Sequence, residues 1–170
     1  MPDLPDAVAP LRDLPAWHVR RGIGSFVTLE FGEPRLEVYD VRDARRPVAG
    51  ERRVVPHREV RVRGGWTLWV QYCDWTLTWR EHLLAHSESP DVEIDRALAI
   101  LNGQKLVSAT TADGSASLAF DLGCVLATRP YSDADAGQEQ WELFQPSGAV
   151  LTLYADGQLT AGRADEPSER

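Results

Sequence analysis

The feature that most constrains the fold is a set of runs in which apolar and polar residues alternate between glycine turns. Alternation with period two gives a β-strand one buried side and one wet side. Residues 24–32 alternate in this way, as do residues 114–123. A Trp-x-Leu-aromatic stretch follows each run, at 66–69 and at 141–144. The pattern predicts two similar β halves, with an ordinary antiparallel meander as the alternative.

One segment departs from the alternation and has helical periodicity. Its apolar residues Ile94, Ala97, Leu98 and Leu101 recur at i, i+3, i+4 and i+7, so we predict a helix that packs on a sheet. Ser89 is expected to cap it, and Asn102 with the following glycine to end it. Strands are expected near 25–31, 35–41, 53–63, 66–72, 75–79, 105–111, 115–121, 124–128, 140–145 and 149–155.

These elements predict a mainly β (α+β) domain. We expect two pseudo-repeated antiparallel β halves, at 17–88 and 104–160, joined by one principal helix at 89–103. The expected core consists of the large apolar residues on the buried sides of these elements: Leu29, Phe31, Trp66, Leu68, Trp75, Leu77, Ile94, Leu98, Leu118, Phe120, Trp141 and Leu143.

The 170 residues suit a single domain with a sizeable core. Four prolines among the first fifteen residues predict a flexible segment over 1–16, and the polar composition of 161–170 predicts a disordered tail. The chain has no apolar run of membrane-spanning length and no signal-peptide pattern. We therefore expect a cytoplasmic protein without a membrane partner.

Charge is distributed unevenly along the chain. The net charge is -8, yet residues 42–63 contain eight arginines and three acidic residues, a local balance of +5 that leaves -13 for the remainder. The segment is either a solvated loop and strand face or a contact for an anion or nucleic acid. The acidic total and the single lysine make nucleic acid an unlikely partner. The candidate binding residues here are Arg45, Arg46, Arg52, Arg53, Arg61 and Arg63.

Trp69 and Cys73 are the other candidate binding residues. Alternation places them with Thr67 and Gln71 on the side of the strand opposite Trp66. We expect a second layer of the domain to cover this side; the alternative is an aromatic side chain presented to a ligand or partner. The two cysteines are expected to be small buried thiols rather than a disulfide.

The sequence contains none of the common catalytic and metal-binding motifs. His82 and His86 are four residues apart, with His57 as a conceivable third ligand, but the surrounding residues do not form the His-Glu-x-x-His pattern of zinc proteases. A nucleophile elbow, a phosphate loop and a dinucleotide fingerprint are also missing from the sequence. We expect no catalytic residue, no metal and no cofactor.

Residues 101–106, 118–123, 140–148 and 156–157 carry a family resemblance. Their order of Leu-x-Gly-Gln, Phe-x-x-Gly, Trp-x-Leu and Asp-Gly resembles an uncharacterised family of small bacterial β domains, and residues 31–32 and 65–75 resemble the N-terminal portion of one such family. The resemblance implies a β fold and assigns no catalytic residue. Some families of this kind are immunity proteins that accompany toxins.

These observations favour a non-enzymatic cytoplasmic binding protein with a protein partner of basic character, a toxin-immunity inhibitor being one form of it. The alternative is a small-molecule-binding or enzymatic domain with a pocket between the two β halves, where Trp69, Cys73 and an arginine would converge. The sequence leaves the oligomeric state open.

Overall fold

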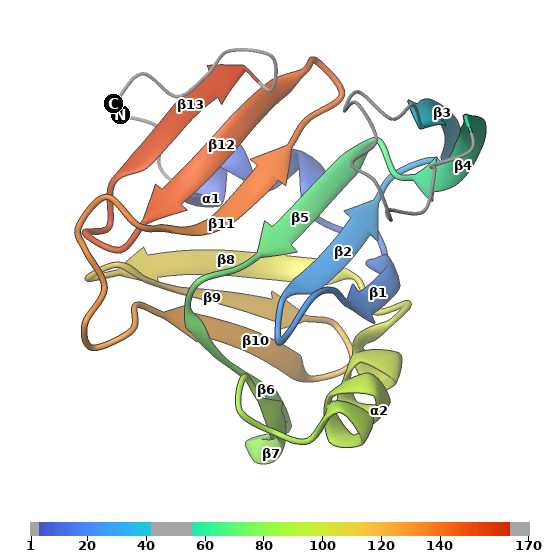
Figure 1. Ribbon diagram of the computed structural model, residues 1–170. Helices are drawn as coiled ribbons and strands as arrows, with labels where there is room; N and C mark the ends of the chain where they lie inside the picture. Colours follow the sequence, from blue (N-terminus) through green and yellow to red (C-terminus); the bar gives the residue numbers. More distant parts are fainter. Residues whose placement is uncertain (1–3, 42–55, 164–170) are drawn as a thin grey trace, which may run out of the picture.

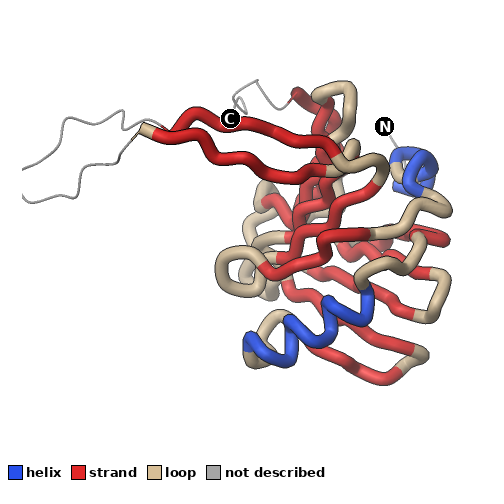
Figure 2. Tube along the Cα trace, turned by 90° about the vertical axis from the view of Figure 1, so that its right-hand side faces the viewer, coloured by secondary structure: helices blue, strands red, loops and turns tan. Residues whose placement is uncertain are grey.

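The computed structural model describes residues 4–41 and 56–163, and most of its strands form two antiparallel sheets that face each other across the core (Figures 1 and 2). The six-stranded sheet has the order β1 (Trp17–Arg21), β2 (Val27–Phe31), β5 (Trp66–Val70), β11 (Glu139–Phe144), β12 (Ala149–Tyr154), β13 (Leu159–Arg163). The five-stranded sheet has the order β7 (His82–His86), β6 (Asp74–Trp79), β10 (Cys124–Arg129), β9 (Ser115–Phe120), β8 (Leu106–Ala112). A separate two-stranded ribbon consists of β3 (Arg35–Val41) and β4 (His57–Arg63).

A mainly β fold with antiparallel sheets and one principal helix is confirmed. The structure adds β1, β7 and β13 to the expected strands. Each of these three is five residues long and lies at an edge of its sheet or beside the helix. Short edge strands carry little alternation, which is why the sequence did not indicate them.

The two halves of the chain do not pack as separate units, because each sheet takes strands from both sides of the helix in sequence. The runs compared as repeats lie in different sheets: the first contains β2 and the second contains β9. The Trp-x-Leu stretches are instead neighbours, since β5 and β11 pair antiparallel with Leu68 opposite Leu143. Alternation identifies a strand with two unlike sides and carries no information about which sheet it joins.

The principal helix, α2 (Asp91–Leu101), closes one side of the domain between β1 and β7 (Figure 1). Its expected apolar stripe is buried, and Gly103 ends it with a left-handed φ of +93°. The cap expected at Ser89 is wrong: its hydroxyl accepts a hydrogen bond from the backbone N–H of His86 at 3.0 Å and closes the preceding turn instead. No helix among the described residues is both long enough and apolar enough to cross a membrane.

The core lies between the two sheets. Eleven of the twelve expected core residues are buried, and the twelfth, Trp66, is partly buried against them. The largest members are Trp75 and Trp141, both 2% exposed. Because protein interiors are close-packed, the loss of a large buried side chain lowers the stability of the fold.

The N-terminal segment is packed, so the expectation of a flexible segment over 1–16 is wrong for its described part. Helix α1 (Leu4–Ala7) and the short 3-10 helix η1 (Ala9–Leu11) bury Leu4, Val8 and Leu11 in the core beside β8. These residues have helical spacing, and the proline within the segment suits the start of a helical turn rather than breaking one. At the other end, β13 includes the first three residues of the tail expected to be disordered, and 164–170 lie outside the described residues.

Candidate functional site: an aromatic and acidic patch

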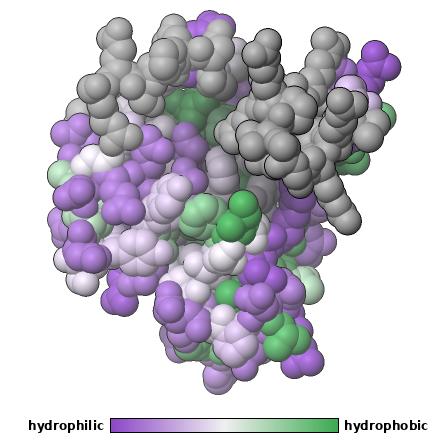
Figure 3. Space-filling model, in the orientation of Figure 1, coloured by the Kyte–Doolittle hydropathy of each residue, from purple (hydrophilic) through white to green (hydrophobic). Residues whose placement is uncertain are grey.

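Trp69 lies on the outer side of the six-stranded sheet and is 36% exposed. Its neighbours Leu68 and Val70 are buried, so they point into the core while Trp69 points outward. The expectation that another layer covers this side is therefore wrong for Trp69. Figure 3 shows that the face of the molecule in view is mainly hydrophilic, with hydrophobic residues in a few small areas.

Two further aromatic side chains accompany Trp69. The ring of Phe26 meets Tyr72 at a centroid distance of 5.0 Å and Trp69 at 6.3 Å, with interplanar angles of 74° and 79°. Such edge-to-face pairs are the favoured arrangement of aromatic rings. We call Phe26, Trp69 and Tyr72 the aromatic patch. Ile23, which is 88% exposed, lies in the same β1–β2 turn as Phe26.

The turn between β1 and β2 holds Phe26 in place. Gly22 donates its backbone N–H to the carbonyl oxygen of Phe26 at 2.7 Å, and Phe26 donates to Ile23 at 3.3 Å. The direction of the Tyr72 side chain is set by a left-handed backbone conformation, with φ of +48°. A bulky residue rarely adopts this conformation, which costs of the order of 1 kcal/mol. In Tyr72 the conformation directs the side chain outward, and the residue is 48% exposed.

An acidic side chain borders the aromatic patch. Glu142 on β11 lies directly opposite Trp69 on β5, and Gln71 donates its side-chain N–H to Glu142 at 3.2 Å. Glu142 is half-buried, and burial raises the pKa of its carboxyl, with the charge of Glu139 raising it further. A carboxylate held in a partly desolvated position responds strongly to an approaching cation.

The raised pKa predicts how Glu142 affects stability. The folded state binds the proton more tightly than the unfolded state, so the ionised carboxylate destabilises the fold at pH 7 and this penalty disappears below about pH 4. Glu142→Gln should therefore raise the free energy of unfolding at pH 7, by less than about 1 kcal/mol given the partial exposure, and leave it unchanged at the lower pH. Urea unfolding at the two pH values measures both effects.

Glu37 provides the matched control, since a hydrogen bond from the Tyr39 hydroxyl is the main cause that lowers the pKa of its carboxyl. Glu37→Gln should shift stability at pH 7 in the opposite direction to Glu142→Gln. Equal shifts of the two variants would show that burial of Glu142 carries no electrostatic penalty.

Cys73 does not join Trp69 in one site. It is 2% exposed, and its thiol donates to the carbonyl oxygen of Gln140 with an S to O distance of 3.6 Å. Burial raises the pKa of the Cys73 thiol to about 12, with Asp74 adding to the effect. The thiolate needed for nucleophilic chemistry is therefore absent at neutral pH. Cys73 and Cys124 are both free and buried, as the sequence predicts.

The candidate arginines divide into two groups. Arg45, Arg46, Arg52 and Arg53 lie outside the described residues. Arg61 and Arg63 lie on β4, as expected for a strand with a charged side, where Arg61 pairs with Glu59 at 2.8 Å and Arg63 with Glu30 at 3.1 Å. Neither belongs to the aromatic patch.

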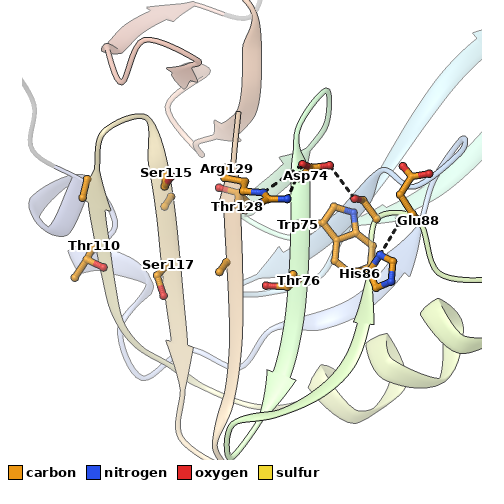
Figure 4. A pocket seen from close by; sticks show the side chains of 14 residues that line it. Asp74, Trp75, Thr76, His86, Glu88, Thr110, Ser115, Ser117, Thr128 and Arg129 are labelled. Carbon is orange, nitrogen blue, oxygen red and sulfur yellow. Dashed lines mark hydrogen bonds and ion pairs between the residues drawn. The ribbon is translucent and has the colours of Figure 1, made fainter. Parts of the chain in front are cut away.

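A hollow of about 550 Å³ lies on the outer side of the five-stranded sheet (Figure 4). Residues from both sides of α2 in sequence line it, but it lies on one sheet and not between two β halves, where the alternative hypothesis expected a pocket. Asp74 pairs there with Arg129 at 3.2 Å and accepts from the Ser87 hydroxyl at 3.4 Å. Trp69 and Cys73 are not among the lining residues.

The described residues contain no group of three His, Cys, Asp or Glu side chains placed to hold a metal ion. His82 and His86 lie on β7, whereas His57 lies on the β3–β4 ribbon. Comparison with known proteins finds no matching family model, no similar curated protein and no similar solved structure.

Sequence reasoning identified Trp69 and missed its partners. Continuing the alternation of β5 past its end would place Tyr72 on the buried side, but the strand ends at Val70 and the backbone reverses at Tyr72. Phe26 falls within the strand expected near 25–31, whereas the structure places it in the turn before β2. Gly22 and Gly24, just before Phe26, were the available signal for the turn. Nothing in the sequence indicates that Tyr72 has a left-handed backbone conformation.

Proposed function

We propose that this protein binds a cationic, partly apolar segment of another polypeptide at the aromatic patch. One observation carries the proposal: three aromatic side chains pack edge to face on an outer surface beside a half-buried carboxylate. The faces of Trp69 and Tyr72 attract guanidinium and ammonium groups, and Glu142 supplies the opposite charge. Tryptophan and tyrosine are also the residues that most often dominate binding energy at protein interfaces.

The net charge of the chain supports a basic polypeptide over other ligands. The chain outside 42–63 has a net charge of -13, which attracts a basic partner over a distance and repels phosphate groups. A toxin-immunity inhibitor that covers a basic surface of its toxin is one form of this function. We propose a cytoplasmic setting, which suits the free thiols of Cys73 and Cys124.

Defined peptides test the proposal. A fluorescent peptide of Gly-Arg-Leu repeats should bind the wild-type protein, and the binding should weaken with added salt; a peptide of Gly-Glu-Leu repeats should not bind. Trp69→Ser should weaken binding at least about 10-fold, the size expected for an interface hot spot. Fluorescence anisotropy measures these affinities.

Trp79 supplies the matched control. It is also 36% exposed, but it lies on the five-stranded sheet with the guanidinium of Arg80 over its ring at 4.9 Å. Trp79→Ser should bind the arginine peptide like the wild type. Equal binding by Trp69→Ser, or equal binding of the two peptides, would contradict the proposal.

The hollow on the five-stranded sheet supports a second candidate function, the binding of a small polar ligand. A carboxylate, a guanidinium and several hydroxyl groups converge there, and such groups orient small ligands in protein sites. A thermal-shift screen of small acids and sugars tests it. A compound that raises Tm of the wild type and of Trp69→Ser, but not of Arg129→Ala, would establish this function; no response to any compound would refute it.

A further inference from the structure

We infer that the β3–β4 ribbon of one molecule docks on the aromatic patch of a second copy, so that two copies form a reciprocal dimer. The inference rests on the proposed function, because it identifies the cationic and apolar segment that the patch binds as part of the chain itself.

The ribbon has an apolar side that no described residue covers. Leu36 lies opposite Val62 and Val38 opposite Val60, and these four side chains are between 42% and 70% exposed. The other side carries charged residues, including Arg61 and its partner Glu59. Among the described residues, neither ribbon strand pairs with a strand outside the ribbon. A lone two-stranded ribbon with an exposed aliphatic side is marginally stable in water and gains by packing on another surface.

The base of the ribbon is fixed to the body by a buried glutamate. Glu30 is 0% exposed and accepts hydrogen bonds from Arg63 at 3.1 Å, from the backbone N–H of Gly64 at 3.0 Å and from the Thr67 hydroxyl at 2.6 Å. Gly64 is needed for this approach, since a Cβ there would overlap the carbonyl oxygen of Phe31. The ribbon therefore leaves the body at a defined point and direction.

This direction separates the ribbon from its own patch. The ribbon starts beside Phe31 at the end of β2, whereas Phe26 precedes β2 at the other end of that strand, roughly 17 Å away. Figure 2 shows the ribbon extending away from the body. The ribbon would have to reverse its path to reach its own patch, so a contact between a ribbon and a patch joins two molecules.

The ribbon has the chemistry that the patch is proposed to bind. The two strands of the ribbon contain four arginines and three acidic residues, a balance of +1 against -9 for the remainder of the chain. Val60 and Val62 supply the apolar contact, while Arg61 lies on the other side of the strand, where it pairs with Glu59. Seven residues of strand span about 23 Å, enough to cross the patch. Two copies that exchange ribbons make the same contact twice, as in a closed two-fold dimer.

A mixing experiment tests this arrangement by sedimentation velocity. The ribbon variant combines Val38→Ser with Val60→Ser, and the patch variant is Trp69→Ser. The wild type should be a dimer that weakens with salt, and each variant alone should be a monomer, because either change removes both contacts. An equimolar mixture should recover a heterodimer held by one intact ribbon on one intact patch. Circular dichroism checks that both variants fold, and Trp79→Ser should remain dimeric.

Two results would overturn the inference. If ribbons paired with ribbons, the patch variant alone would remain a dimer, because its ribbon is unchanged, and the mixture would contain no heterodimer. A wild type that is monomeric up to about 100 μM, well above a typical interface Kd, would also refute it. In that second case, binding of the Gly-Arg-Leu peptide through Trp69 would leave the proposed function intact with a foreign partner, whereas no peptide binding would refute both.

Discussion

Replacing Trp75 with alanine should lower the free energy of unfolding by about 3–5 kcal/mol. Trp75 is 2% exposed, and its indole N–H donates to the carbonyl oxygen of Ser25 at 2.7 Å. Truncation leaves a cavity between the two sheets and an unpaired carbonyl in the turn that holds Phe26. Urea denaturation followed by circular dichroism measures the change.

Trp79 on the same strand is the control. Its indole N–H also donates to a backbone carbonyl, that of Leu122 at 3.0 Å, but 36% of the residue is exposed. The two tryptophans therefore share strand, size and hydrogen bonding and differ in burial. Trp79→Ala should cost roughly 1 kcal/mol. Equal losses from the two substitutions would contradict the assignment of Trp75 to the core.

Glu30→Ala should have the next largest effect, a loss of about 2–4 kcal/mol. The substitution removes the acceptor of three hydrogen bonds at the base of the ribbon and leaves the buried Gly64 N–H and the Arg63 guanidinium without their partner. Chemical denaturation measures the loss. Self-association should fall as well, because the ribbon is no longer held in one direction.

Glu37 on the ribbon is the matched position for this prediction. It also forms an ion pair with an arginine, Arg35 at 2.8 Å, but both side chains reach solvent. Exposed pairs contribute less than about 1 kcal/mol, so Glu37→Ala should unfold at nearly the wild-type urea concentration. If Glu37→Ala lowered the free energy of unfolding as much as Glu30→Ala, burial would not explain why the contacts of Glu30 stabilise the fold.

The fold was predictable where strands and helix carry a clear period. β9 begins and ends within one residue of the sequence expectation and α2 within two residues, and the buried sides of β2, β5 and β11 follow from alternation. The interleaving of the two halves was not predictable, because alternation does not specify the pairing of strands that are distant in sequence. The packing of residues 4–11 was missed because prolines were taken as a sign of disorder, although Leu4, Val8 and Leu11 have helical spacing.

The candidate site was predictable only in part. Trp69 stood out because an aromatic residue on the outer side of a strand is unusual. Cys73 was grouped with it by continuing the same alternation past Val70, where the strand ends; beyond that point the backbone turns at Tyr72 and directs Cys73 into the core. The contact of Phe26 with Tyr72 joins residues 46 positions apart, which only the tertiary structure reveals.

We propose above that the aromatic patch binds a cationic segment of a polypeptide. Fluorine NMR of the protein with its six tryptophans replaced by 5-fluorotryptophan tests it most directly. The spectrum is recorded on the ribbon variant, Val38→Ser with Val60→Ser, so that no ribbon competes, and Trp69→Phe and Trp79→Phe versions assign the two exposed signals. On addition of the Gly-Arg-Leu peptide, the Trp69 signal should shift in a saturable way while the Trp75, Trp79 and Trp141 signals stay in place. A spectrum in which the Trp69 signal does not move, or in which the Trp79 signal moves in its place, would contradict the claim.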